Sequence, residues 1–513
     1  MTGIPAFLLA LASTAASGGT ATPIKKVVVI FQENVSFDHY FASYPVARNP
    51  PGEPAFHAAP GTPTVNGISG WLATHNPNST QPFRLSRSQA ATCDQDHDYT
   101  PEQQAMHGGL MDRFPEFTGA GSGCDQGQVM GWFDGNTVTA LWNYAQNFAM
   151  SDNFFDTTFG PSTPGHLNLI SGQTHGVNAF NQPLRDTDVA PGTGTVIGDP
   201  EGFYDDCQTA ETVGLSGRNV GDLLNAKGVT WGWFQGGFSP TSRDARGKAV
   251  CELSHVGSDG KPQRDYVPHH EPFQYYASTS NPHHLPPTSV AMIGHTDQAN
   301  HQYDLADFWT AASAGNLPAV CYLKAPAYLD GHAGYSDPLA EQRFLVDTIN
   351  RLQKLPDWKE MAIFIAWDDS DGWYDHVMPP IVSRSNSSAD ALTGPSVPGS
   401  PPSGDCGVPA PGAYLGRCGY GQRLPFLVIS PYARRNFVDH SVTDLTSILR
   451  LIEDNWDLGR IGDQSFDAQA GSLLGMFDFG LGNSNRRVLL DPSTGEPVGT
   501  RGATAASTAA PRH

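Results

Sequence analysis

The sequence has few charged residues, no long apolar run and no Cys-x-x-Cys pair. Charged residues occupy 16% of its 513 positions, against roughly 25% in an average globular protein. This argues against a coiled coil or a charge-rich disordered chain. No stretch approaches the ~18 consecutive apolar residues of a membrane-spanning helix, so we expect no transmembrane anchor. Without a Cys-x-x-Cys pair, a zinc ribbon and a thioredoxin-type redox site are excluded.

Basic residues are also scarce, because 30 Lys and Arg stand against 51 Asp and Glu and leave a formal net charge of −21. A protein that binds the phosphate backbone of nucleic acids needs a basic surface, so we expect no nucleic-acid partner. An anionic membrane surface would also repel the chain as a whole, although a local patch could differ. The net charge therefore argues against a nucleic-acid partner but does not identify the substrate or partner that the protein has.

The first residues and the cysteines favour an oxidising compartment. Residues 4–16 form a short apolar run that ends in small residues and resembles a secretory signal, although no Lys or Arg precedes it. A misassigned start codon and a disordered tail are the alternatives. Six of the seven cysteines lie in Gly- or Asp-rich loop sequence, which suggests three local disulfides and leaves Cys321 as a buried thiol, although sequence alone does not fix the pairing. The expected pairs are Cys93–Cys124, Cys207–Cys251 and Cys406–Cys418. Disulfides persist outside the cytosol, so we expect a secreted or periplasmic protein.

Short apolar runs that alternate with helical patterns predict an α/β fold with a mostly parallel central sheet. Continuous apolar runs of this length are typical of strands covered on both faces. The predicted strands are 25–31, 229–234, 317–323, 361–367 and 424–430. The predicted helices are 138–155, a segment that begins at Pro338, and 441–456.

The remaining sequence is rich in Gly, Pro, Asn and Ser and shows little periodicity. Segments 44–135 and 177–290 are predicted to be long insertions on the loop side of the sheet, where substrate-selecting elements usually lie. We expect one catalytic domain over 22–482, preceded by a leader-like segment over 1–21 and followed by a flexible tail over 483–513.

Two of the predicted strands end directly in carboxylate and amide side chains. Glu33 and Asn34 follow the first strand, and Asp368 and Asp369 follow the fourth. Ligands collect at the carboxyl ends of parallel strands, and these side chains offer oxygen atoms to a hard cation. Adjacent carboxylates also repel each other unless a cation compensates. The alternatives are a solvated acidic turn and, for the first pair, a turn in which Asn34 or Ser36 caps a helix.

A third motif places Ser162 in the sequence GPSTPGH, directly before the apolar segment LNLI that is expected to begin a helix. A hydroxyl at a helix N-terminus faces free N–H groups and the positive end of the helix dipole, which suits a phosphate group. The alternative is that Ser162 or Thr163 only caps the helix.

Taken together, these motifs resemble a known family. ENxSFDHYF, PSTPGHLNLISG, DGHAGYSDP, WDDSDGWYDHV and RLPFLVISPYA occur in family order over about residues 24–457. This combination is similar to the phosphoesterase family of bacterial phospholipases C and related acid phosphatases. That family belongs to the alkaline phosphatase-like superfamily, so the resemblance implies a three-layer α/β/α sandwich.

The resemblance also implies a metal centre and a nucleophile. Glu33, Asn34, Asp368 and Asp369 match the family's metal ligands, and Ser162 matches its nucleophile. The metal would lower the pKa of the serine hydroxyl, the alkoxide would attack phosphorus, and water would hydrolyse the phosphoserine. We expect one divalent cation. Oxygen ligands favour Ca²⁺, Mg²⁺ or Mn²⁺, with Zn²⁺ not excluded.

Histidines are implied to complete this site. His332 in DGHAGYSDP matches a histidine that holds the phosphoryl group or serves the leaving group. His97 and His270 are weaker matches to further active-site histidines, with His269 or His301 as alternatives to His270.

Several alternatives for the function remain open. A phospholipase C that cleaves phospholipid headgroups, in some cases at a membrane surface, is preferred over an acid phosphatase that acts on monoesters. Sulfatases share the pattern around Ser162, but here His166 stands where they carry Arg, and Glu33-Asn34 replaces their Asp pair. A secreted non-catalytic binding protein is the alternative from another class. Some aromatic side chains could stack on a choline-like cation or belong to the core. They are Trp132, Phe133, Tyr275, Tyr276 and Trp373.

Overall fold

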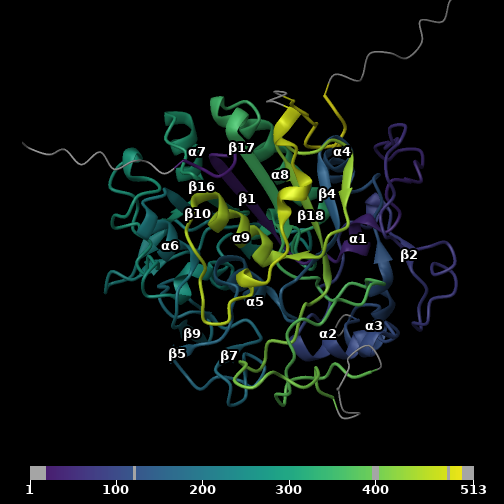
Figure 1. The fold of residues 1–513 in the computed structure, drawn as a ribbon, viewed down its shortest axis with the longest axis horizontal. Helices are drawn as coiled ribbons and strands as arrows, with labels where there is room; N and C mark the ends of the chain where they lie inside the picture. Colours follow the sequence, from purple (N-terminus) through teal and green to yellow (C-terminus); the bar gives the residue numbers. More distant parts are fainter. Residues whose placement is uncertain (1–18, 120–122, 395–403, 482–485, 499–513) are drawn as a thin grey trace, which may run out of the picture.

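The computed structural model describes residues 19–119, 123–394, 404–481 and 486–498. Its centre is a nine-stranded sheet in the order β15-β10-β16-β1-β17-β18-β4-β19, with β20 also paired to β4 (Figure 1). The strands are β1 (Lys26–Gln32), β4 (Ala149–Phe155), β10 (Trp231–Gln235), β15 (Gln302–Asp304), β16 (Val320–Lys324), β17 (Met361–Trp367), β18 (Arg423–Ile429), β19 (Phe437–Asp439) and β20 (Thr443–Asp444). Only β18 runs antiparallel to its neighbours within this sheet. The predicted mostly parallel α/β sheet is confirmed, and all five predicted strands belong to it.

Helices cover both faces of the sheet. Phe31 and Gln32 are adjacent in β1 and therefore point to opposite faces. The ring of Phe31 lies 4.8 Å from His166 in α5 (Ser162–Ser171), whereas Gln32 Nε2 lies 3.5 Å from Glu341 Oε1 in α8 (Pro338–Leu352). Because α9 (Leu445–Trp456) packs on α5 and α4 (Thr139–Asn147) packs on α8, the fold has the three layers that the resemblance implied.

One helix prediction is half wrong. The pattern over 138–155 is helical only as α4, which ends at Asn147. Phe148 leaves the helical conformation, and the following residues form β4, which pairs with β18 on one side and with β19 and β20 on the other. Backbone pairing in the sheet therefore overrides the apolar spacing that favoured a longer helix.

The described parts of the two predicted insertions carry short elements around the sheet. The first contains β2 (Phe83–Arg84), α2 (Tyr99–Met106), α3 (Phe114–Phe117) and β3 (Gly131–Trp132). The second contains β5 (Val177–Phe180), β6 (Val189–Ala190), β7 (Thr195–Val196), β8 (Glu201–Gly202), β9 (Thr212–Leu215), β11 (Ser242–Arg243), β12 (Ala249–Val250), β13 (Ser254–Val256) and β14 (Pro262–Arg264). It is interrupted by α6 (Val220–Lys227), which packs on α5, and by β10 of the central sheet. Elsewhere, α1 (Phe37–Phe41) follows β1 and α7 (Leu305–Ala314) follows β15.

The three predicted disulfides are present, and Cys321 is a buried free thiol. Of the segment predicted as a flexible tail, residues 486–498 instead lie against the body of the protein. Asn350 Nδ2 in α8 donates to Leu490 O at 2.7 Å, and the Leu490 side chain is fully buried. The predicted leader falls outside the described residues except for 19–21, where Ala21 N donates to Asn455 O at 2.9 Å. Within the described part of the chain, no helix is long and apolar enough to cross a membrane.

Candidate active site

The polar residues after β1 and β17 lie side by side. The two strands are parallel neighbours and their last residues, Gln32 and Trp367, are paired in register, so the residues that follow emerge at one point of the sheet edge. Asn34 adopts a left-handed conformation with φ of 61°, which Asn tolerates better than most residues. Its backbone N–H donates to Asp368 Oδ1 at 3.0 Å, and this bond ties the two strand ends together.

Ser162 reaches this cluster from the first turn of α5. Its Oγ lies 3.1 Å from Glu33 Oε2 and 3.2 Å from Asp369 Oδ2. The N-cap of α5 is Pro161, so the Ser162 side chain does not cap the helix. The N–H of Thr163 donates to Asp199 Oδ1 at 2.8 Å. The capping alternative is therefore wrong for Ser162, whose hydroxyl faces carboxylates from two strand ends.

The predicted histidines lie around the same cluster. His270 Nε2 lies 3.4 Å from Glu33 Oε2, and its side chain is almost fully buried. His97 Nε2 lies 3.3 Å from Asn34 Nδ2, and the rings of His97 and His332 are 6.1 Å apart. Of the alternatives to His270, His301 is turned away, since its ring stacks on Trp231 and its Nδ1 bonds to the carbonyl of that residue.

Three further residues also belong to the cluster: His166 and Lys324, which the sequence analysis did not place in the site, and Asp371, an acid that closely follows the pair Asp368-Asp369. His166 Nδ1 lies 2.8 Å from Ser162 O and 3.6 Å from Asp368 Oδ2. Asp371 Oδ1 accepts from Asn34 Nδ2 at 3.0 Å. Lys324 Nζ donates to Glu33 Oε1 and is fully buried. The signal for Lys324 is its place as the last residue of a buried strand adjacent to β1, where an otherwise apolar run ends in a charge.

Burial and mutual repulsion dominate the electrostatics of the cluster. Burial, followed by the charge of Asp368, raises the pKa of both Glu33 and Asp369 well above the ordinary values. Burial, followed by the charge of Lys324, lowers the pKa of His166 to about 3 and that of His270 well below its ordinary value. Several carboxylates thus share one buried site in which Lys324 is the nearest fixed cation, and a bound cation would relieve their repulsion.

The donor atoms of the site fit a metal ion. Among the described residues, the buried atoms Asn34 Oδ1, Asp368 Oδ2 and His270 Nε2 have no hydrogen-bond partner. Glu33, His166 and His270 also each offer a ligand atom within 4.8 Å of the others. Buried polar atoms are otherwise nearly always paired. Unsatisfied atoms on several residues of one cluster, beside three side chains whose ligand atoms lie within 4.8 Å of one another, therefore indicate a place for a cation.

Other residues in or near these motifs have structural roles. Ser36 Oγ accepts from His39 N at 3.2 Å and caps α1, which leaves Asn34 available to the site. His376 does not contact the acidic pair, and its Nδ1 lies 2.6 Å from Asp38 Oδ2. Four of the five aromatic side chains considered for a choline-like cation are almost fully buried, the exception being Trp132, which is half-buried. They therefore belong to the core.

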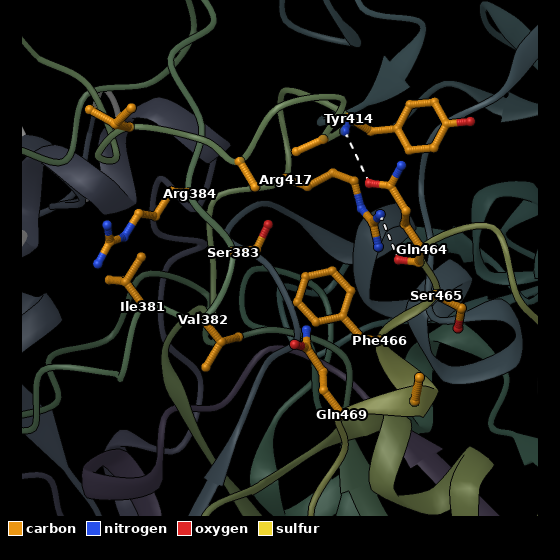
Figure 2. A pocket seen from close by; sticks show the side chains of 14 residues that line it. Ile381, Val382, Ser383, Arg384, Tyr414, Arg417, Gln464, Ser465, Phe466 and Gln469 are labelled. Carbon is orange, nitrogen blue, oxygen red and sulfur yellow. Dashed lines mark hydrogen bonds between the residues drawn. The ribbon is translucent and has the colours of Figure 1, made fainter.

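A separate cavity of about 680 Å³ lies at the other end of α5. Figure 2 shows Arg417 beside Phe466 and Gln464 in its wall. The guanidinium of Arg417 donates to the carbonyl of Gly172, the C-cap residue of α5. At ~1.5 Å per helical residue, Gly172 lies about 15 Å from Ser162. None of the eight predicted site residues lines this cavity.

A serine at a helix N-terminus, facing carboxylates and histidines at the strand ends of an α/β sheet, is an arrangement suited to hydrolysis. The comparisons agree. The chain belongs to the phosphoesterase family, whose model matches residues 24–459, and it is therefore a phosphoric ester hydrolase.

The similar curated proteins are phospholipases C. Phospholipase C B of Mycobacterium tuberculosis is 25% identical over 90% of this chain and 79% of its own length. Non-hemolytic phospholipase C of Pseudomonas aeruginosa is 23% identical over 85% of this chain and 54% of its own length. Non-specific phospholipase C6 of Arabidopsis thaliana is 24% identical over 81% of this chain and 63% of its own length. Among solved structures, murine ectonucleotide pyrophosphatase/phosphodiesterase 5 matches 66% of this chain and 95% of its own at 13% identity, with a TM-score of 0.32.

Proposed function

We propose that this protein hydrolyses phosphodiesters of the phospholipid class as a phospholipase C, with Ser162 as the nucleophile. The observation that carries the proposal is the position of Ser162 Oγ, 3.1 Å from Glu33 and 3.2 Å from Asp369 at the joined ends of β1 and β17. The phospholipases C that match over most of the chain support the choice of substrate class.

Glu33, Asn34, Asp368 and Asp369 would hold a divalent cation. Bound there, it would lower the pKa of the Ser162 hydroxyl and neutralise charge on the phosphoryl oxygens. The oxygen donors favour Ca²⁺, Mg²⁺ or Mn²⁺. The imidazoles of His166 and His270 beside Glu33 would also suit Zn²⁺.

Each residue of the site then has its own role in the reaction. Ser162, deprotonated to its alkoxide, attacks phosphorus in line with the departing alcohol. The new Oγ–P bond of the phosphoserine forms as the bond between phosphorus and the alcohol oxygen breaks. His270, buried beside Glu33, would hold a phosphoryl oxygen. His97, next to Asn34, and His332, whose ring lies 6.1 Å from that of His97, are the imidazoles that would protonate the departing alcohol. Water then cleaves the phosphoserine and restores the hydroxyl.

The decisive test is Ser162→Ala. We expect it to abolish hydrolysis of p-nitrophenyl phosphorylcholine and phosphatidylcholine while divalent-metal binding, measured by calorimetry, persists. Thr163→Ala, which changes the neighbouring hydroxyl on the same helix, is the matched control and should keep most of the activity. Retained activity in Ser162→Ala would reject the nucleophile.

The substrate class is tested separately. Wild-type protein that cleaves p-nitrophenyl phosphate but neither choline ester would make it an acid phosphatase. An intact mass showing formylglycine at residue 162 would make it a sulfatase.

We also propose that the protein acts outside the cytosol. The three disulfides support this location, because such bonds persist in oxidising compartments. Phospholipid substrates lie at membrane surfaces, so the protein would meet them there without a spanning helix of its own among the described residues.

A further inference from the structure

Glu102, in helix α2 of the first insertion, lies between the two loops that carry the proposed nucleophile and the acidic pair. Its carboxylate is almost fully buried. Oε1 accepts from Ser370 Oγ at 2.5 Å, and Oε2 accepts from the backbone N–H of Gly160 at 3.0 Å. Ser370 directly follows Asp369, and Gly160 stands two residues before Ser162. One carboxylate therefore forms a hydrogen-bonded bridge between the loop that carries Ser162 and the loop that carries Asp369.

Both ends of this bridge are held in place. Gly160 has a φ of 120°, which L side chains rarely adopt, and this conformation presents its N–H to Glu102. Ser370 Oγ in turn accepts from Gly372 N at 3.0 Å, in the turn that contains Asp371. Burial raises the pKa of Glu102 to about 7, and the hydrogen bonds from Ser370 and Gly160 oppose this rise. The carboxylate of Glu102 thus accepts hydrogen bonds from both loops at once, and such bonds to a carboxylate are strong enough to hold the loops together.

We propose that Glu102 is a positioning residue that fixes the distance between Ser162 and Asp369 through Gly160 and Ser370. This inference rests on the proposed function, because the geometry it protects is that of the phosphoryl-transfer site. Misplacing a reacting group by about 1 Å can cost ~100-fold in rate. Loss of the bridge should therefore lower kcat rather than substrate affinity, and it should also weaken metal binding through Asp369.

The neighbouring residue provides a matched control. Gln103 lies on the same helix and is equally buried, but its amide accepts from the backbone N–H groups of Ala391 and Leu392, away from the site. Gln103→Ala should therefore match Glu102→Ala in thermal destabilisation without moving either loop.

The experiment measures kcat, KM and the Kd for Mn²⁺ in four single variants and in the double variant that combines Glu102→Ala with Ser370→Ala. We expect Glu102→Ala to lower kcat by at least ~30-fold with KM changed less than threefold, and to weaken Mn²⁺ binding about tenfold. Glu102→Gln should recover kcat to within about fivefold, because its carbonyl accepts from Gly160 and its amide donates to the Ser370 hydroxyl. Ser370→Ala should reproduce a large part of the loss and combine non-additively with Glu102→Ala.

Two results would overturn the proposal. One is a loss in Glu102→Ala no greater than that in Gln103→Ala. The other is additive behaviour of Glu102→Ala and Ser370→Ala. If Glu102→Ala does not fold, Ser370→Ala decides the question, and a loss of kcat in Ser370→Ala no greater than that in Gln103→Ala would overturn the proposal. A wild-type protein without phosphoesterase activity would refute the proposed function instead, and the Mn²⁺ titrations would still test the bridge.

Discussion

The buried guanidinium of Arg423 offers the sharpest test of what holds the loops of the site together. It lies at the start of β18 with no exposed surface. Its nitrogens lie 3.0 Å from Asp375 Oδ2 and 3.1 Å from Asp38 Oδ1. A further nitrogen donates to the carbonyls of Asn66 at 2.8 Å and Asp152 at 3.0 Å. Arg423 thus joins α1, β4 and the loop after the acidic pair.

Replacing this side chain by methionine keeps the bulk but leaves the buried carboxylate of Asp375 without its cation and that of Asp38 with only the imidazole of His376. Breaking a buried pair in this way costs about 3–5 kcal/mol. With an unfolding entropy of roughly 2.1 cal/mol/K per residue, a chain of this size loses about 1 °C of Tm for each kcal/mol. We therefore expect Arg423→Met to lower Tm by about 3–5 °C in differential scanning calorimetry.

The control and the pH dependence separate charge from packing. Arg246 pairs with Asp244 at 3.2 Å on the surface, and exposed pairs contribute about 1 kcal/mol or less, so Arg246→Met should change Tm by no more than about 1 °C. Burial already raises the pKa of Asp375 to about 6 in the presence of Arg423. Without the cation its folded-state pKa rises further, so stability falls as pH rises through the interval between the unfolded and folded values. The penalty should therefore be larger at pH 8 than at pH 5. A Tm within 1 °C of wild type at pH 8, or a penalty that does not grow with pH, would refute the reasoning.

Two further predictions follow from buried groups near the sheet edge. Burial raises the pKa of Glu341 to about 8, so between about pH 5 and 8 the folded chain holds a proton that the unfolded chain releases, and stability falls as pH rises. Glu341→Gln should flatten this part of the Tm–pH curve, and an unchanged slope would contradict the shift. His270→Asn should lower kcat by at least ~100-fold, whereas His301→Asn, which removes an imidazole that faces Trp231, should keep kcat within a few-fold of wild type. If His270→Asn and His301→Asn lower kcat for p-nitrophenyl phosphorylcholine equally, the result would contradict a catalytic role for His270.

The sheet and the strand-end cluster could be predicted because their signals are local. An apolar run that ends in Glu33-Asn34 or Asp368-Asp369 marks both the strand and the point where it meets the loop side. The second half of 138–155 could not be predicted, since β4 forms only by pairing with strands that lie hundreds of residues later. Lys324 was missed for a related reason, because its partner Glu33 becomes a neighbour only once β16 pairs with β1.

Some residues of the site come from the central sheet and others from the insertions, and this difference explains which of them can be predicted from the sequence. The central sheet supplies Lys324 as the last residue of β16 and the carboxylates directly after β1 and β17. All of these residues are buried at the strand ends, so their positions are fixed by the core. The insertions supply Glu102 from the short helix α2, and His97 and His270 from segments outside the α-helices and strands. Loops of this kind tolerate change more readily than strands. The chain carries a net charge of −21 and the cluster at the sheet edge is itself acidic, so we expect Lys324 and a bound metal ion to supply the positive charge that attracts a phosphate ester. The two insertions surround the acidic cluster and can change without altering it. We therefore expect the preference for one phosphate ester over another to depend on the insertions.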